Sequence, residues 1–228
     1  MVLRLFTLLS LLILLSSCGV AYVTKAATYQ FSMLGSRVPN LEARASGKLS
    51  LQERQNLDVI EEVRGFGSKL GLNVGELYGT VALGWSHTIW NVSASEPLSF
   101  QSATWWFPIV GTVPYLGYFE KEAALEQVQN LEDSGLETYL RTAGAYSTLG
   151  YFEDPVLPSM LRWSEWTLAR VILHELTHAT IWLPGSVNFN ESVANFVGEV
   201  AALKFLKAKY GSESRTLARA KASLQDQR

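Results

Sequence analysis

The sequence predicts an α+β fold that is mainly helical and carries a small β-sheet. Apolar residues recur at helical spacing towards both ends of the chain, whereas residues 78–119 are rich in aromatic and β-branched residues interrupted by glycine and proline. The chain has 228 residues, of which 48% are hydrophobic, which is enough for one well-packed domain over residues 18–228. A net charge of −2, without a basic run before the last helix, argues against nucleic-acid binding.

The N-terminus has the pattern of an export signal. A basic residue, Arg4, precedes an apolar run over residues 5–15, which is short for a membrane span. Leu15-Ser16-Ser17-Cys18 resembles the lipobox of bacterial lipoproteins, in which the cysteine becomes the acylated first residue. This resemblance implies that residues 1–17 are removed and that Cys18, the only cysteine, carries lipid on the outer membrane, facing the periplasm. An ordinary signal peptide and an uncleaved anchor are the alternatives.

The first half of the mature chain predicts two helices and then strands. The helices are expected at residues 27–41 and 50–70, with Gly71 ending the second. Residues 81–85 and 87–92 are expected to form paired strands, and residues 105–119 to form short strands and turns of the core.

The second half predicts more helix. A helix over residues 121–133, ended by Gly135, and a strand over residues 136–141 complete a strand–helix–strand unit. After a loop over residues 142–158, we expect helices at residues 159–182, at residues 190–209 and from about residue 213.

The helix at residues 159–182 contains the sequence His174-Glu175-Leu176-Thr177-His178, an HExxH motif. Residues four apart lie one turn apart on one helix face, so the two imidazoles are placed to hold one metal ion. Glu175 lies about 100° further round the helix, where its carboxylate can accept a proton from water. The structural alternative is a buried helix whose two histidines only hydrogen-bond to neighbours.

A catalytic zinc ion needs a third protein ligand. Glu191 and Glu199 compete for this role on the following helix, which should run antiparallel to the first. We rank Glu191 as the ligand and Glu199 as a neighbour of the site, because the face of Glu191 bears small residues that allow a close approach: Ala194, Asn195, Gly198 and Ala202. Alternatively, Asn188 and Glu191 form a capping box and Glu191 only caps its helix.

These motifs resemble those of a known family. HExxH followed by Asn190-Glu191 resembles the gluzincin metallopeptidases. A closer resemblance, to the family of bacterial lipoproteins named Putative aminopeptidase, rests on residues 106–111 with 117–119, residues 145–150 with 154–157, and residues 174–180 with 189–192. It implies a zincin-like fold, one zinc ion and peptidase activity, with Asn190 beside the ligands. Members continue further beyond the helix of Glu191, so part of a cleft wall is expected to be absent.

Other polar residues are candidates for substrate binding. Tyr146, in a Gly-rich loop before the HExxH helix, is a candidate to stabilise an oxyanion, although it is equally expected to pack under the loop. His87 is more simply a packed or solvent-facing histidine. Glu153 and Asp154 are candidates to bind a substrate α-ammonium, with solvated loop charges as the ordinary explanation.

The sequence therefore predicts a zinc-dependent peptidase, an aminopeptidase by resemblance, tethered to the bacterial cell envelope. A peptide is the expected substrate, and Glu175 is the expected general base. The alternatives are an envelope lipoprotein that uses the same domain to bind a partner, with any metal structural, and an intact fold whose peptidase site has decayed.

Overall fold

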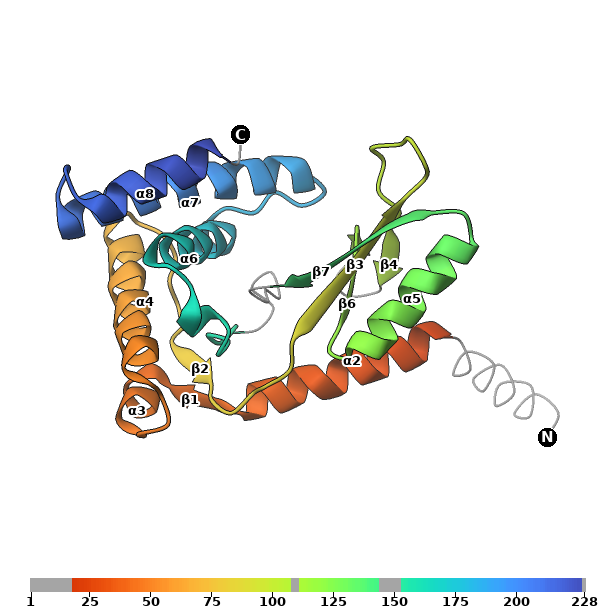
Figure 1. Cartoon of the computed structure of the whole chain (residues 1–228), viewed down its shortest axis with the longest axis horizontal. Coiled ribbons are helices and arrows are strands. Elements are labelled where there is room, and N and C mark those ends of the chain that lie inside the picture. Colours follow the sequence, from red (N-terminus) through yellow and green to blue (C-terminus); the bar gives the residue numbers. More distant parts are fainter. Residues whose placement is uncertain (1–17, 108–110, 144–152, 227–228) are drawn as a thin grey trace. The chain divides into compact units, whose positions relative to one another are not determined.

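The computed structural model describes residues 18–107, 111–143 and 153–226 (Figure 1). Within them the chain is α+β, with more helix than strand and with small antiparallel sheets, which confirms the predicted class. It divides into two compact units, formed by the described parts of residues 1–35 with 86–143 and of residues 36–85 with 144–228. The single domain over residues 18–228 stays a prediction, and the export signal at residues 1–17 lies outside the described residues.

The first unit contains a split β-α-β arrangement. Its elements are α2 (Cys18–Gly35), β3 (Ile89–Ser95), β4 (Trp105–Phe107), β5 (Gly111–Val113), β6 (Leu116–Tyr118), α5 (Lys121–Asp133) and β7 (Glu137–Ala143). The main sheet has the order β6-β3-β7, and β3 is antiparallel to both neighbours, so β6 and β7 run parallel. Helix α5 connects them, as the predicted strand–helix–strand unit requires.

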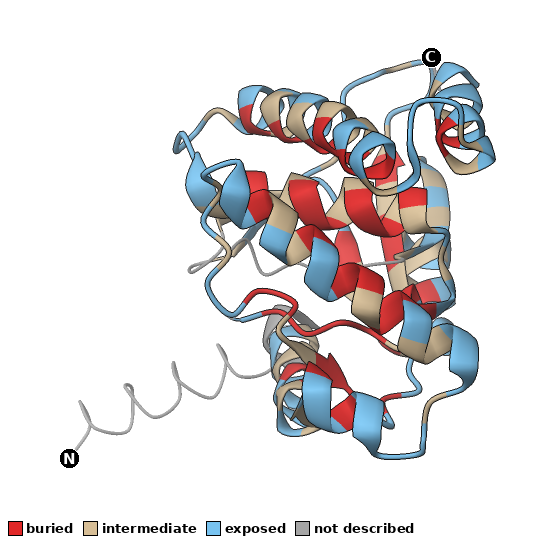
Figure 2. Ribbon diagram, turned by 90° about the vertical axis from the view of Figure 1, so that its left-hand side faces the viewer, coloured by how far each residue is buried: buried red, intermediate tan, exposed pale blue. Residues whose placement is uncertain are grey.

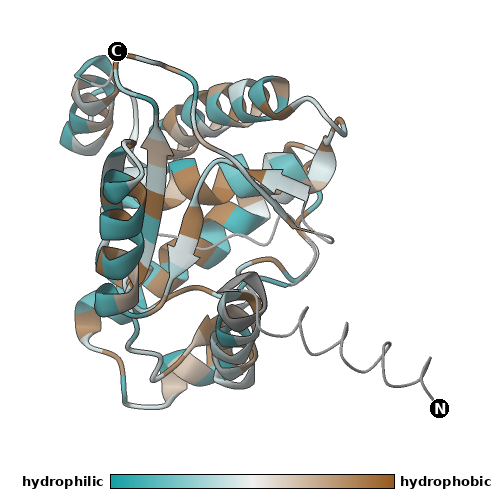
Figure 3. Ribbon diagram, turned by 90° about the vertical axis from the view of Figure 1, so that its right-hand side faces the viewer, coloured by the Kyte–Doolittle hydropathy of each residue, from teal (hydrophilic) through white to brown (hydrophobic). Residues whose placement is uncertain are grey.

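Helix α5 has the predicted bounds. It presents buried Ala124 on the side that contacts β3 and β7, and its other residues are largely polar, as Figure 3 shows by colour. Gly135 follows the helix with φ +85°, a left-handed conformation that glycine adopts without steric cost. The predicted short strands of residues 105–119 are also present, as the β4–β5 hairpin and β6.

The second unit is a group of helices with one small sheet. Its elements are β1 (Arg37–Pro39), α3 (Asn40–Ala45), α4 (Leu51–Lys69), β2 (Thr80–Ala82), the 3-10 helix η1 (Met160–Arg162), α6 (Glu165–Thr180), α7 (Val187–Tyr210) and α8 (Arg215–Gln225). Figure 2 shows buried residues alternating with exposed ones along these helices, as expected for helices with one apolar face.

Helix α4 supports α6 and confirms the helix predicted at residues 50–70. Ser50 and Glu53 form a reciprocal capping box at its start, and Gly71 follows its end with φ +84°. Gly67 lies against α6 so closely that a Cβ atom there would be 2.7 Å from Leu176 Cδ1. Buried Asn56 donates hydrogen bonds to the carbonyls of Leu161 and Trp163, which fixes the chain just before α6.

The predicted pairing of residues 81–85 with residues 87–92 is wrong. Strand β2 pairs with β1, whereas β3 pairs with β6 and β7 in the other unit. The reason is that both edges of β2 are already occupied. On the edge away from β1, Val156 donates to the Thr80 carbonyl at 2.7 Å, and Ala82 donates to the Val156 carbonyl at 2.9 Å.

The helix predicted at residues 27–41 is also displaced. Helix α2 already includes Cys18 and ends at Gly35, and strand β1 separates it from α3. Pro39 accounts for the break, because its ring restricts the preceding residue to extended conformations and it has no N–H to donate. In the described ranges, no helix combines the length and the apolar character that crossing a membrane requires.

Candidate metal centre

The HExxH motif lies on α6, a helix buried on most sides. The helix begins at Glu165 rather than at residue 159, because Ser164 caps it by accepting a hydrogen bond from the Thr167 N–H at 3.1 Å. The residues before it form η1 instead. Leu168, Ile172, Leu173 and Leu176 are fully buried, so the packing of α6 sets the direction in which its two histidines point.

Helix α7 carries Glu191 and begins three residues earlier than predicted, at Val187. Asn188 therefore lies inside the helix, and the cap residue Ser186 makes no side-chain capping bond. The capping-box explanation of Glu191 is thus wrong. Asn190, predicted beside the ligands, is buried and forms two hydrogen bonds of 2.9 Å with the N–H and carbonyl of Leu183, which fix the connection between the two helices.

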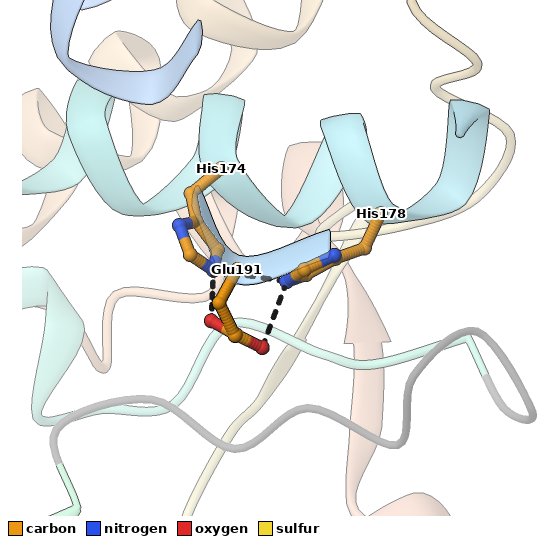
Figure 4. A group of neighbouring side chains, drawn as sticks. All are labelled: His174, His178 and Glu191. Atoms are coloured by element: carbon orange, nitrogen blue, oxygen red, sulfur yellow. Dashed lines mark hydrogen bonds and ion pairs between the residues drawn. The ribbon is translucent and has the colours of Figure 1, made fainter. Parts of the chain in front are cut away.

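The three predicted ligand residues converge. His174 and His178 point from α6 towards Glu191 of α7 (Figure 4). One ligand atom from each lies within 4.8 Å of the other two. The two Nε2 atoms are 3.0 Å apart, and the Glu191 carboxylate oxygens lie 3.5 Å from His174 Nε2 and 3.4 Å from His178 Nε2.

The spacing and chemistry of these atoms fit a tetrahedral zinc ion. Zinc lies about 2.0–2.1 Å from nitrogen and oxygen ligands, so neighbouring ligands of a tetrahedron are about 3.3 Å apart. The two Nε2 atoms are 3.0 Å apart, and each has a different Glu191 oxygen near this distance: Oε2 lies 3.5 Å from His174 Nε2 and Oε1 lies 3.4 Å from His178 Nε2. Two imidazoles with one carboxylate form a donor set that suits zinc and leaves one position open.

A very close helix contact brings these residues together. A Cβ atom on Gly198 of α7 would lie 2.7 Å from the Arg170 carbonyl oxygen and 3.1 Å from His174 Cβ. Ala194 and Ala202, on the same face of α7, are fully buried. The prediction that a small-residue face allows a close approach to the HExxH helix is therefore confirmed.

The pKa shifts of His174 and Glu191 favour the protonation states in which these residues bind metal ions. Burial lowers the pKa of His174, and the nearby His178 lowers it further, while Glu191 and a hydrogen bond with Asn195 oppose these effects. The hydrogen bond with His178 lowers the pKa of Glu191, whereas burial of Glu191 acts against it. His174 is thus neutral and Glu191 ionised at neutral pH, which are the forms that bind metal ions.

Tyr78 is a neighbour of the site that the sequence did not reveal. It is fully buried, and its hydroxyl group has no hydrogen-bond partner in the described part of the chain. Burial raises its pKa well above the usual value, and the charges of Glu175 and Asp154 contribute. These two carboxylates are therefore within electrostatic range of one tyrosine. The only sequence signal was an aromatic residue at the start of the segment that contains β2.

The remaining candidates differ in their environments. Asp154 is buried, so the explanation as a solvated loop charge is wrong for this residue, whereas Glu153 is exposed and lies 3.7 Å from Arg37. Glu199 is half-buried on α7 and is not part of the three-residue group. His87, in the first unit, is exposed with its ring against Tyr29. Tyr146 lies outside the described residues.

An α+β protein with two histidines and a glutamate converging from a helix hairpin has the geometry of a metal-site protein. The model of the family described as Putative aminopeptidase matches residues 21–228, so the chain belongs to this family. Comparisons with curated proteins and with solved structures find no match.

The contact at Gly198 predicts a large effect of one methyl group. Gly198→Ala should lower the free energy of unfolding by about 1–3 kcal/mol, since the added Cβ would clash with the backbone of α6. Urea unfolding in EDTA measures this without a contribution from bound metal.

The matched control is Gly65→Ala on α4, where a Cβ atom would have no neighbour within 4 Å. This substitution should be neutral or stabilising by up to about 1 kcal/mol. Equal effects of the two substitutions would show that the close helix contact does not constrain the hairpin.

Proposed function

We propose that this chain is a zinc-dependent aminopeptidase with a gluzincin-like, zincin-type site. The observation that carries the proposal is the convergence of His174, His178 and Glu191, two from an HExxH motif and one from the following helix. These residues would hold one zinc ion and leave a coordination position open. Membership of the Putative aminopeptidase family supports a peptide substrate.

In this proposal the zinc ion, Glu175 and Tyr146 each have a separate role in hydrolysis. Bound zinc supplies Lewis acidity towards water and towards the scissile carbonyl. Glu175 accepts a proton from the water as its oxygen attacks the carbonyl carbon, and then passes the proton to the amine nitrogen as the C–N bond breaks. Tyr146 is the proposed hydrogen-bond donor to the oxyanion.

An aminopeptidase must also recognise a free α-ammonium group, for which a carboxylate is the natural partner. We retain Asp154 for this role because it is buried and shares an electrostatic environment with Glu175 through Tyr78. Glu153 is the weaker candidate because it is exposed and close to Arg37. The Coulomb attraction between a carboxylate and a cation is stronger where less water screens the pair, and this gain opposes the cost of desolvating both charges.

Replacing the general base separates metal binding from catalysis. Purified wild-type protein should contain about one zinc per chain and hydrolyse aminoacyl amides. Glu175→Gln should keep the zinc and lose activity by at least about 100-fold, because the amide cannot accept the proton. Zinc is measured by atomic absorption and hydrolysis by release of the amine.

Two other outcomes would contradict the proposal in different ways. Wild-type protein that binds zinc without hydrolysing any aminoacyl amide would favour the alternative of a partner-binding lipoprotein with a structural metal. Wild-type protein that binds no zinc would remove the basis of the site altogether.

The two competing glutamates of α7 provide a matched pair of variants. Glu191→Gln should weaken zinc binding by at least about 100-fold, because losing even a residue that only orients a ligand costs about 10–100-fold. Glu199→Gln, outside the group, should weaken it at least about tenfold less than Glu191→Gln does. Competition against a fluorescent zinc chelator measures both affinities, and the reverse order would assign the third ligand to Glu199.

We further propose that the chain is anchored through an acylated Cys18 to the outer membrane, facing the periplasm. The lipobox-like residues 15–18 support this location. Full-length protein made in a Gram-negative host should sediment with membranes and incorporate labelled palmitate, whereas Cys18→Ala should incorporate none. Unlabelled, soluble wild-type protein would contradict the anchor without affecting the proposed site.

A further inference from the structure

The segment between the two metal-binding helices, together with the first residue of α7, exposes an unusual number of large apolar side chains. Ile181, Trp182, Leu183 and Val187 are each 41–50% exposed, and together we call them the apolar rim. Single exposed apolar residues are ordinary, but four within seven positions are of the kind that marks an interaction or ligand-binding surface.

The rim is built on fixed backbone. The Asn190 side chain accepts a hydrogen bond from the Leu183 N–H and donates one to the Leu183 carbonyl. The N–H of Ile181 donates to the Thr177 carbonyl at 2.8 Å. Asn190 itself is 2% exposed. The apolar side chains are therefore held at the surface by a buried hydrogen-bonded residue, which makes the rim a preorganised surface.

The rim is continuous with the proposed zinc ligands. The Trp182 ring packs edge-on against the ring of His178, with centroids 5.4 Å apart. Val187 precedes Glu191 by four positions, one turn of α7, so the two lie on the same helix face. The Glu191 side chain is 45% exposed, whereas that of His178 is only 4% exposed. A molecule that reaches the ligand atoms past Glu191 thus comes from a part of the surface that adjoins the rim. Apolar walls with a few convergent polar groups are typical of small-molecule sites.

The charges of the rim argue against a membrane surface as its occupant. Residues 179–196 contain no lysine or arginine, and Glu191 is their only charged residue. Segments that lie on anionic membranes carry basic residues beside their apolar ones. Because Trp182 packs against His178, an occupant that contacts Trp182 would lie beside the metal site.

We propose that the apolar rim is the subsite for the side chain of the substrate's N-terminal residue, with Trp182 as its inner wall. The substrates are then peptides that begin with a large apolar residue such as leucine or phenylalanine. The inference rests on the proposed aminopeptidase function, which supplies the zinc ion and the scissile bond. Trp182 determines specificity here by contact with the substrate.

The sharpest test measures binding separately from turnover. Leucine hydroxamate and alanine hydroxamate share a zinc-binding group and differ only in the side chain that the rim would contact. Calorimetry on zinc-loaded Glu175→Gln protein should give a dissociation constant about tenfold lower for the leucine compound. Adding Trp182→Ala should reduce this ratio towards one, and adding Trp182→Phe should retain most of it.

The matched control is Phe196→Ala. Phe196 is 67% exposed on the same helix hairpin, but it lies about 140° round α7 from Glu191. Its removal should leave the leucine-to-alanine ratio unchanged. Circular dichroism and zinc content verify that each variant remains folded and loaded.

Kinetics then distinguish failure of this inference from failure of the proposed function. Wild-type protein should hydrolyse Leu-Ala with a kcat/KM about tenfold above that for Ala-Ala. Selective binding of leucine hydroxamate without hydrolysis would contradict the peptidase function and keep the subsite. Equal binding of the two hydroxamates, or a Phe196→Ala effect equal to that of Trp182→Ala, would overturn the subsite whether or not the protein is active.

Discussion

The candidate site depends on the contact between the backbones of α6 and α7 at Gly198. Side chains of ordinary size at this position would separate the helices, because a single Cβ atom there would already lie 2.7 Å from the Arg170 carbonyl oxygen. The same contact places His174 beside the helix that carries Glu191, and it uses the small residues that follow Glu191 on one helix face. The metal geometry is thus a consequence of helix packing. Two short-range features complete it: the HExxH spacing within α6, and the Asn190 hydrogen bonds that fix the turn before Glu191.

The parts of the site that follow from helical periodicity could be predicted from the sequence. Residues four apart share a face in any α-helix, so the pairing of His174 with His178 needed no knowledge of tertiary structure. The ranking of Glu191 above Glu199 also used only angles around a helix, together with the expectation of a hairpin. The competing explanation, a capping box, could not be excluded in this way, because it depended on where α7 begins. Helix α7 begins at Val187, where two hydrogen bonds between the Asn190 side chain and the Leu183 backbone fix the turn before it. The sequence pattern does not encode this contact across the turn.

The fold shows the same division between local and non-local features. Helices α4 and α5 have bounds close to those predicted, since apolar spacing and a following glycine define both locally, and a capping box also defines the start of α4. The partner of β2 was predicted wrongly, because it is chosen by β1 and Val156, which are 43 and 75 positions from Val81. Pairing partners so distant in the chain leave no signal in either segment. The burial of Asp154 also involves a residue distant in the chain, since its backbone carbonyl accepts a hydrogen bond from the Tyr78 N–H.

The exposure of the three ligand residues indicates how such a site would meet its substrate. Burial of His178 and the half-exposure of Glu191 make the group accessible from one side, and the apolar rim adjoins it there. An apolar side chain bound at the rim would displace water from beside the ligand atoms, which strengthens electrostatic interactions in their vicinity. In the proposed function, the connection between the helices and the first residue of α7 would then have two roles: they would set the position of the third ligand, and they would offer the surface that selects the substrate. Both roles depend on Asn190, because its hydrogen bonds fix Glu191 and the apolar rim relative to each other.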